Sequence, residues 1–244
     1  MSLRLPATSV WPILVMLCAA CDTAPAPKSA VTTTPEVAPA SSVAAPAPTS
    51  STVSPNRRIV MLGDSLTSGL GLEPEQAFPA LLQARFDARG TGFVIVNAGV
   101  SGDTSAGALR RLDWALDGGA AVVLVALGGN DALRGLPVAD LASNLDEIVR
   151  RAKATGARVI LAGMEAPPNT GPDYAASFRA VYPAVAKKHG ATLVPFLLDG
   201  VAGIEALNQE DGIHPNPAGA RIVADTVWRA LEPLLRELEA LPAR

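Results

Sequence analysis

Apolar residues after position 56 fall into short continuous runs, and stretches of helical periodicity separate these runs. The first four runs in particular are nearly uninterrupted, which is typical of strands buried on both faces of a parallel sheet. Five β-strands are predicted, at residues 57–62, 93–97, 121–127, 158–162 and 192–194.

Between the runs, apolar residues recur at the spacing of one helix face. Leu141, Leu145 and Ile148 show this spacing, and Gly156 and Gly190 stand where helices are expected to end. Helices are predicted at residues 77–88, 105–116, 138–154, 173–189 and 217–238, and the stretch Gly63-Asp64-Ser65-Leu66-Thr67 is expected to open a helix that Asp64 or Ser65 caps.

The alternation of strands and helices predicts a three-layer α/β/α domain at residues 57–244. Its sheet is expected to be flavodoxin-like, with five parallel strands in a doubly wound order. A chain of 244 residues with 49% hydrophobic composition can supply one substantial core. The formal net charge is -3, and no basic stripe is present, which argues against nucleic acid as a partner. We expect a monomer.

A different pattern occupies the N-terminus. Arg4 precedes an apolar stretch at residues 10–17, which is shorter than the roughly 20 residues of a membrane-spanning helix. This order indicates a signal peptide at residues 1–21. Its end, Ala-Ala-Cys21, resembles a bacterial lipobox, although Cys18 stands where an aliphatic residue is usual. We expect a periplasmic protein of the bacterial cell envelope, anchored to a membrane through lipidated Cys21; secretion after cleavage near Ala20 is the alternative.

Residues 22–56 consist mainly of Ala, Pro, Ser, Thr and Val, without Leu, Ile or an aromatic residue. Such a segment cannot bury a core, so it is predicted to be a disordered linker that tethers the domain. Cys18 and Cys21 are the only cysteines of the chain. The domain therefore has neither a cysteine nucleophile nor a cysteine-based zinc site.

Four polar blocks lie at the ends of the predicted elements. Ligands of open α/β sheets bind at the carboxyl ends of the strands, so these blocks are the candidate functional loops. They are Gly63-Asp64-Ser65-Leu66 after the first strand, residues 97–104 after the second, Gly128-Gly129-Asn130-Asp131 after the third, and residues 211–216 before the last helix.

A catalytic serine needs a base, and the chain contains two histidines. His189 precedes Gly190 in a basic segment, where a solvated cation at a helix C-terminus is expected. His214 lies three residues after Asp211 in a loop that contains Gly and Pro. This spacing lets the carboxylate hold the Nδ1–H group, so that Nε2 faces the serine. The predicted catalytic triad is Ser65, His214 and Asp211.

Serine, glycine, asparagine and histidine, each in its own block and in this order, resemble the SGNH (GDSL) hydrolase family. The resemblance covers essentially all of residues 57–244, and it is closest to the bacterial thioesterase I, lysophospholipase and arylesterase branch. It implies an oxyanion hole formed by the backbone N–H of Ser65, the backbone N–H of Gly102 and the side-chain amide of Asn130. Such donors would stabilise the tetrahedral intermediate without adding charge.

The resemblance implies hydrolysis of acyl esters through an acyl-Ser65 intermediate, with no cofactor. In this branch, loops border an apolar groove for the acyl chain, and Leu133, Leu136 and Met164 are candidates to line it; simple packing of these loops onto the domain is the alternative. Lysophospholipids, aryl esters and short- or medium-chain esters are the expected substrates. Thioesters are less favoured, because coenzyme A thioesters should be scarce outside the cytoplasm. A glycan O-acetyl esterase is the close alternative.

Two readings from other classes remain as alternatives. Asp64, Asp103 and Asp131 could serve a metal-dependent phosphoesterase, but such sites normally use several histidines, and only His214 is suitably placed. No metal is therefore predicted. Asp64 and Asp103 are interpreted as caps or local acceptors at helix starts, and Asp131 as a residue that orients its own loop. The second alternative is a non-catalytic envelope module that binds lipid or glycan.

Overall fold

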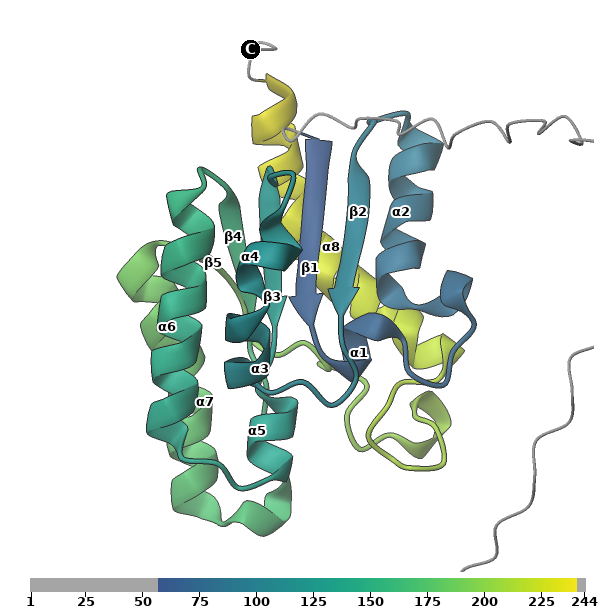
Figure 1. Ribbon diagram of the computed structural model, residues 1–244. Helices are drawn as coiled ribbons and strands as arrows, with labels where there is room; N and C mark the ends of the chain where they lie inside the picture. The colour runs from purple at the N-terminus through teal and green to yellow at the C-terminus, as the bar shows by residue number, and fades with distance from the viewer. Residues whose placement is uncertain (1–56, 241–244) are drawn as a thin grey trace, which may run out of the picture. The chain divides into compact units, whose positions relative to one another are not determined.

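The computed structural model describes residues 57–240, so the predicted signal peptide, Cys21 and the linker lie outside the described residues. A five-stranded sheet with the order β2-β1-β3-β4-β5 forms the centre of the domain, and every neighbouring pair of strands is parallel (Figure 1). The strands are β1 (Arg58–Gly63), β2 (Val94–Gly99), β3 (Val122–Ala126), β4 (Arg158–Ala162) and β5 (Thr192–Val194). The predicted doubly wound α/β fold is confirmed.

Helices cover both faces of the sheet. On one face α2 packs against α8, and on the other α6 packs against both α3 and α7 (Figure 1). Right-handed crossovers place the helices on opposite faces, because the chain runs along the sheet in one direction from β1 to β2 and in the opposite direction from β2 through β3 and β4 to β5. The helices are α1 (Ser65–Ser68), α2 (Phe78–Arg89), α3 (Ser105–Arg110), α4 (Leu112–Leu116), α5 (Gly129–Leu133), α6 (Val138–Ala154), α7 (Pro172–His189) and α8 (Pro217–Ala240), with 3-10 turns η2 (Pro74–Gln76), η3 (Pro168–Thr170) and η4 (Glu205–Leu207).

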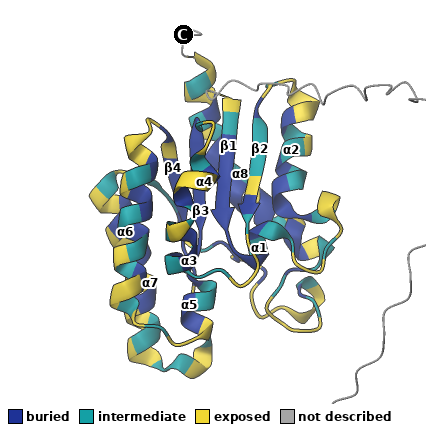
Figure 2. Ribbon diagram, in the orientation of Figure 1, coloured by how far each residue is buried: buried dark blue, intermediate teal, exposed yellow. Residues whose placement is uncertain are grey.

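The sheet is the core of the domain, as the continuous apolar runs predict. Ile59 to Leu62 in β1 are 0% exposed, and all of β3 is buried (Figure 2). The expectation of burial on both faces is wrong for β2, where residues 94–96 are only half-buried and Asn97 is exposed. The reason is that β2 is an edge strand and pairs only with β1.

The helix predicted at residues 105–116 is divided into α3 and α4, which corrects that prediction. Arg111 stands between them with φ -102° and ψ 9°, outside the helical region. Its guanidinium has partners away from both helices: Nε donates to Asp103 Oδ2 at 2.6 Å, and Nη2 donates to the Gly63 carbonyl at 2.9 Å. The spacing of apolar residues along the sequence gives no indication of such contacts.

The strand register brings the functional loops together. Gly63 at the end of β1 pairs with Gly99 of β2 and with Ala126 of β3, so these three strands end at the same level. The strand order reverses around β1, which is where such sheets form a ligand crevice. No helix within residues 57–240 is long and apolar enough to cross a membrane.

Candidate active site

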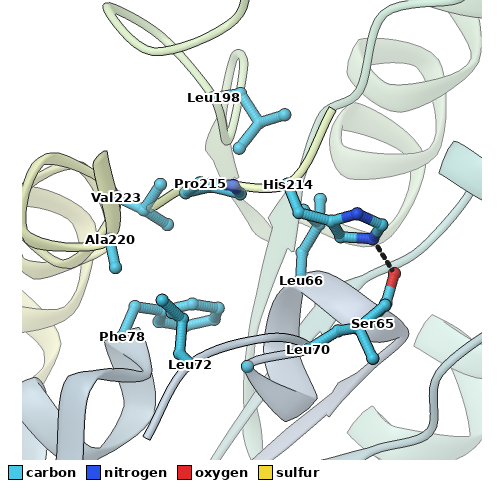
Figure 3. Close-up of a pocket in the computed structure, with 11 residues that line it drawn as sticks. Ser65, Leu66, Leu70, Leu72, Phe78, Leu198, His214, Pro215, Ala220 and Val223 are labelled. Carbon is cyan, nitrogen blue, oxygen red and sulfur yellow. Dashed lines mark hydrogen bonds between the residues drawn. The ribbon is translucent and has the colours of Figure 1, made fainter. Parts of the chain in front are cut away.

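Ser65 is the first residue of α1 and follows β1 after a single intervening residue. That residue, Asp64, is the N-cap of α1, and its Oδ1 accepts the Leu66 N–H at 3.0 Å. The cap interpretation of Asp64 is therefore confirmed. The sharp strand-to-helix turn leaves Ser65 9% exposed, with its hydroxyl directed at the loop that carries His214 (Figure 3).

The structure brings the three predicted triad residues into one chain of hydrogen bonds. His214 Nε2 lies 2.8 Å from Ser65 Oγ, and His214 Nδ1 lies 2.6 Å from Asp211 Oδ2 (Figure 3 shows the first of these). The other oxygen of Asp211 accepts the backbone N–H groups of Ile213 and His214, both at 3.0 Å. The carboxylate thus holds the histidine by its ring and its backbone, and this arrangement can move a proton from the serine to Nε2.

Opposing effects act on the Asp211 carboxyl. Desolvation raises its pKa, but hydrogen bonds from the Ile213 N–H, the His214 ring and the His214 N–H outweigh desolvation and lower the pKa to about 2. Asp211 is therefore ionised at neutral pH and accepts the Nδ1–H of the imidazole. This assignment leaves Nε2 unprotonated toward Ser65, which is the tautomer a general base requires.

The three oxyanion donors that the family resemblance implies lie just beyond the ends of β1, β2 and β3. Gly102 has φ 81°, a left-handed conformation that favours glycine, and Asn130 is the second residue of α5. Within residues 57–240, neither the Ser65 N–H nor the Gly102 N–H donates to an acceptor. Asn130 Nδ2 donates to Asp64 Oδ2 at 3.4 Å, which occupies one of its two hydrogens. Each donor thus has a hydrogen available for a substrate oxygen.

Asp64 lies buried beneath this site and is 2% exposed. Desolvation raises the pKa of its carboxyl to about 6, although the Leu66 N–H, the charge of His214 and the Asn130 amide oppose the rise. The carboxyl thus has two roles, since it caps α1 and orients the Asn130 side chain. Serine and asparagine from different strand ends are connected through this one residue.

A cavity of ≈ 480 Å³ opens beside the triad. Leu133 and Met164, two of the three residues that the family resemblance makes candidates to line a groove, line this cavity together with Ser65, Asn130 and His214. Leu136 does not belong to the lining; its carbonyl oxygen accepts the Tyr174 hydroxyl at 2.8 Å instead. The remaining lining residues are mostly apolar or small, and they are Asp64, Leu66, Gly129, Glu165, Ala166, Pro167, Pro168, Phe196, Leu198, Ala202, Gly203, Asn208, Gly212 and Ile213.

Three interpretations of polar residues need correction. Asp103 does not cap α3, because Thr104 Oγ1 accepts the Gly107 N–H and Asp103 pairs with Arg111. Asp131 does not orient its own loop; its carboxylate receives both donors of Ser105. His189 ends α7 as expected but is not solvated, since its side chain is 13% exposed and Nε2 lies 2.7 Å from Asp146 Oδ1.

Sequence reasoning missed Gln209, which connects the two halves of the triad. Its Nε2 donates to the Leu70 carbonyl at 2.7 Å and to the Pro215 carbonyl at 3.0 Å. Its backbone N–H donates to the His214 carbonyl at 2.8 Å. Leu70 follows the helix that begins with Ser65, so one amide ties the serine segment to the histidine loop. A glutamine in a polar loop carries no local signal of such a role.

Comparison with known proteins agrees with this geometry. The model of the GDSL-like lipase/acylhydrolase family matches residues 61–222. The chain belongs to the GDSL-like lipase/acylhydrolase family. The resemblance predicted from the four sequence blocks is confirmed, and the protein is a carboxylic ester hydrolase of this family. The part of the chain described by the structure contains no group of three His, Cys, Asp or Glu side chains that could hold a metal ion.

The region of similarity covers most of the length of each of three similar proteins. The chain is 46% identical over 178 residues to esterase TesA of Pseudomonas aeruginosa, covering 72% of this chain and 89% of that protein. It is 37% identical to thioesterase 1/protease 1/lysophospholipase L1 of Escherichia coli, covering 72% and 84%. A crystal structure of the psychrotrophic esterase EstA from Pseudoalteromonas, inhibited by monoethylphosphonate, is similar with a TM-score of 0.70 and 36% identity, covering 74% of this chain and 99% of that one.

Proposed function

We propose that this family member hydrolyses acyl esters through a covalent acyl-Ser65 intermediate. The observation that carries the proposal is the continuous hydrogen-bonded chain from Ser65 Oγ through His214 to Asp211, at 2.8 and 2.6 Å. His214 Nε2 accepts the serine proton as Oγ attacks the carbonyl carbon, and then gives this proton to the departing alcohol. Water, deprotonated by the same nitrogen, attacks the acyl group and releases the acid and free Ser65.

The negative oxygen of each tetrahedral intermediate would be stabilised by the Ser65 N–H, the Gly102 N–H and the Asn130 amide. These donors are neutral and are held before the substrate arrives, so no reorganisation is needed as charge develops. Asp211 stays charged throughout and stabilises the imidazolium that forms in both halves of the reaction. The residues of this chain thereby account for every proton transfer of the reaction.

The substrates we propose are lysophospholipids, aryl esters and short- or medium-chain esters, with thioesters as weaker substrates. The apolar lining of the cavity supports an acyl chain longer than acetyl, because the exposed Leu133 and the half-buried Phe196 would lose contact with water when such a chain binds. The activities named for the relatives, which are esterase, thioesterase and lysophospholipase, point to the same range of acyl substrates.

A series of p-nitrophenyl esters from acetate to palmitate, together with lysophosphatidylcholine and palmitoyl-coenzyme A, tests this proposal. We expect kcat/KM to rise from acetate to medium chains and to be unchanged by EDTA. Leu133→Ala should lower kcat/KM roughly three- to tenfold for medium chains and little for acetate, since a methylene contact is worth about 0.8 kcal/mol. Leu136→Ala is the matched control, because Leu136 follows the same helix without lining the cavity.

Two outcomes of these assays would contradict the proposal. Activity confined to acetyl esters would favour a glycan O-acetyl esterase, and loss of activity in EDTA would favour metal-dependent chemistry. An equal effect of Leu133→Ala and Leu136→Ala on medium chains would show that the cavity does not hold the acyl group.

We also propose that the protein works in the bacterial cell envelope, on the periplasmic side, anchored by lipidated Cys21. Support comes from the order of Arg4, the apolar stretch and Ala-Ala-Cys21, followed by a linker without core-forming residues. A tether of this kind would let a monomeric domain act on lipids close to the membrane surface. This location also favours esters over coenzyme A thioesters as substrates.

Replacing Cys21 with Ala is expected to move the protein from the membrane fraction to the soluble fraction, because a lipidated first residue would be its anchor. Fractionation of cells followed by immunoblotting measures this, with Cys18→Ala as the control that should stay membrane-bound. A Cys21→Ala protein that remains in the membrane fraction, or a wild-type protein that is soluble, would argue for plain secretion or another anchor.

A further inference from the structure

The proposed donor on Gly102 lies at the exposed tip of the loop that follows β2. Val100 is 43% exposed, and Ser101 and Gly102 are exposed as well. Apolar packing therefore cannot hold this tip in place. An oxyanion donor must nevertheless be fixed at hydrogen-bond distance from the reacting oxygen, and a displacement of about 1 Å can cost a hundredfold in rate. Hydrogen bonds must supply the rigidity that packing does not.

A buried pair of residues connects this loop to the segment that carries Asn130. Asp131 Oδ1 accepts the Ser105 hydroxyl at 2.5 Å, and Asp131 Oδ2 accepts the Ser105 N–H at 2.9 Å. Ser105 is 0% exposed and Asp131 is 2% exposed. Asp131 directly follows Asn130 in α5, while Ser105 begins α3, three residues after Gly102. The pair thus joins the two loops that bear the second and third oxyanion donors.

The buried carboxyl group of Asp131 needs hydrogen-bond donors, and Ser105 supplies two of them. A carboxylate is costly to bury, and Asp131 has no Lys, Arg or His within ion-pair distance among the described residues. Both of its oxygens are used to hold Ser105, and the Asn144 side-chain amide of α6 donates from Nδ2 to Ser105 Oγ at 3.0 Å. Each carboxylate oxygen accepts a different Ser105 donor, and an amide at position 131 would replace one of these two acceptors with an NH2 donor. The carboxylate is thus required for the double contact.

Two arginines reinforce the same connection. Arg134, just after α5, donates from Nη2 to the Gly102 carbonyl at 2.7 Å. Arg111 pairs with Asp103 at 2.6 Å and donates to the Gly63 carbonyl at 2.9 Å, at the end of the strand that leads to Ser65. Arg134 thus joins Gly102 directly to the segment of Asn130, and Arg111 bridges Asp103 to the strand end that precedes Ser65.

We propose that Ser105 and Asp131 form an oxyanion clamp: they are positioning residues that hold the Gly102 N–H and the Asn130 amide in register for the transition state. The proposal rests on the oxyanion assignment made under the proposed function. Charge on the substrate oxygen develops only as the tetrahedral intermediate forms, so loosening the clamp weakens transition-state binding and leaves substrate binding unchanged. The clamp therefore acts on kcat and not on KM.

Asp131→Asn and Ser105→Ala test the clamp in two ways. Asp131→Asn keeps the size of the side chain and removes one acceptor, and Ser105→Ala keeps the backbone contact and removes the hydroxyl. We expect each variant to lower kcat roughly 10- to 100-fold on a medium-chain p-nitrophenyl ester, with KM within about twofold of wild type. If Asp131→Asn fails to fold, the milder Ser105→Ala provides the measurement.

Two further variants separate a positioning role from a structural one. Gln83→Ala removes partly buried contacts to the Phe93 carbonyl and the Ile95 N–H, away from the functional loops. It should lower the melting temperature without changing kcat. Asn130→Ala removes a proposed donor itself and should lower kcat about 10²- to 10³-fold.

The possible outcomes are distinct. Near-normal kcat in Asn130→Ala would overturn the oxyanion assignment, and with it the proposed function of this residue. A low kcat in Asn130→Ala together with normal kcat in Asp131→Asn and Ser105→Ala would overturn the clamp alone. The clamp is also rejected if KM rises in parallel with the fall in kcat, or if Gln83→Ala lowers kcat as much as the clamp variants do.

Discussion

Replacing Ser65 with Ala is expected to lower kcat about a millionfold, because no acyl-enzyme can form without the hydroxyl. The substitution removes only the hydroxyl, which lies 2.8 Å from His214 Nε2. The backbone N–H of residue 65, the other oxyanion donors and the cavity remain in the variant. Hydrolysis of a medium-chain p-nitrophenyl ester measures the loss. Labelling by a fluorophosphonate probe, which reacts with activated serine nucleophiles, should disappear in parallel.

The matched control for Ser65 is Ser177→Ala, an exposed serine on α7 whose loss should change neither activity nor labelling. Labelling of Ser65→Ala at wild-type level would place the nucleophile at another residue. Normal hydrolysis by this variant would reject the covalent mechanism as a whole. Absence of labelling in the wild type would support the non-catalytic lipid- or glycan-binding alternative.

Replacing Asp211 with Asn is expected to lower kcat about 10⁴-fold with a small effect on KM. The carboxylate accepts the Nδ1–H at 2.6 Å, whereas the NH2 group of asparagine can donate to Nδ1 and favour the wrong tautomer. Nε2 would then carry the proton and could not accept one from Ser65. Steady-state kinetics at neutral pH measure this, with Glu210→Gln, the exposed neighbour, as the control.

The lowered pKa of Asp211 adds a pH readout to this prediction. Its folded-state pKa of about 2 lies below the ordinary value of 3.8, so its contribution to stability is present above pH 4 and is lost as pH falls through 2. Asp211 therefore stays ionised across the working range. A wild-type activity profile that rises with an apparent pKa near 4, and loses this limb in Asp211→Asn, would contradict the assignment.

Much of the fold is predictable because most of its strands are continuous apolar runs. β4 and β5 begin and end where the apolar runs do, and α6 matches the periodicity of Leu141, Leu145 and Ile148. Prediction fails where the surroundings of an element decide its burial or length. β2 is half-exposed because it lies at the sheet edge, and Arg111 interrupts a helical pattern because its partners lie on other segments.

The residues of the candidate site were likewise predictable only in part. Ser65, Asp211 and His214 could be predicted as a triad because Ser65 follows the first strand, Asp211 and His214 share the block before the last helix, and His189 belongs to a helix end. The partners of Asp103, Asp131 and His189 could not, since each partner lies on another element or loop segment. Ser105, the partner of Asp131, lies 26 residues earlier in the chain, and no pattern in the sequence indicates a contact between the two residues.

The α/β fold, the family and the three positions of the candidate triad were predictable from the amino-acid sequence alone. These features depend on the order of apolar runs and on short blocks that act locally, so they can be read along one dimension. The hydrogen bonds that hold the Gly102 loop, the choice of Leu133 over Leu136 in the cavity lining, and the contacts by which Gln209 joins the triad loops became visible only in the folded protein. These features depend on hydrogen bonds and contacts between distant segments, whose directions exist only after the sheet has brought its strand ends together.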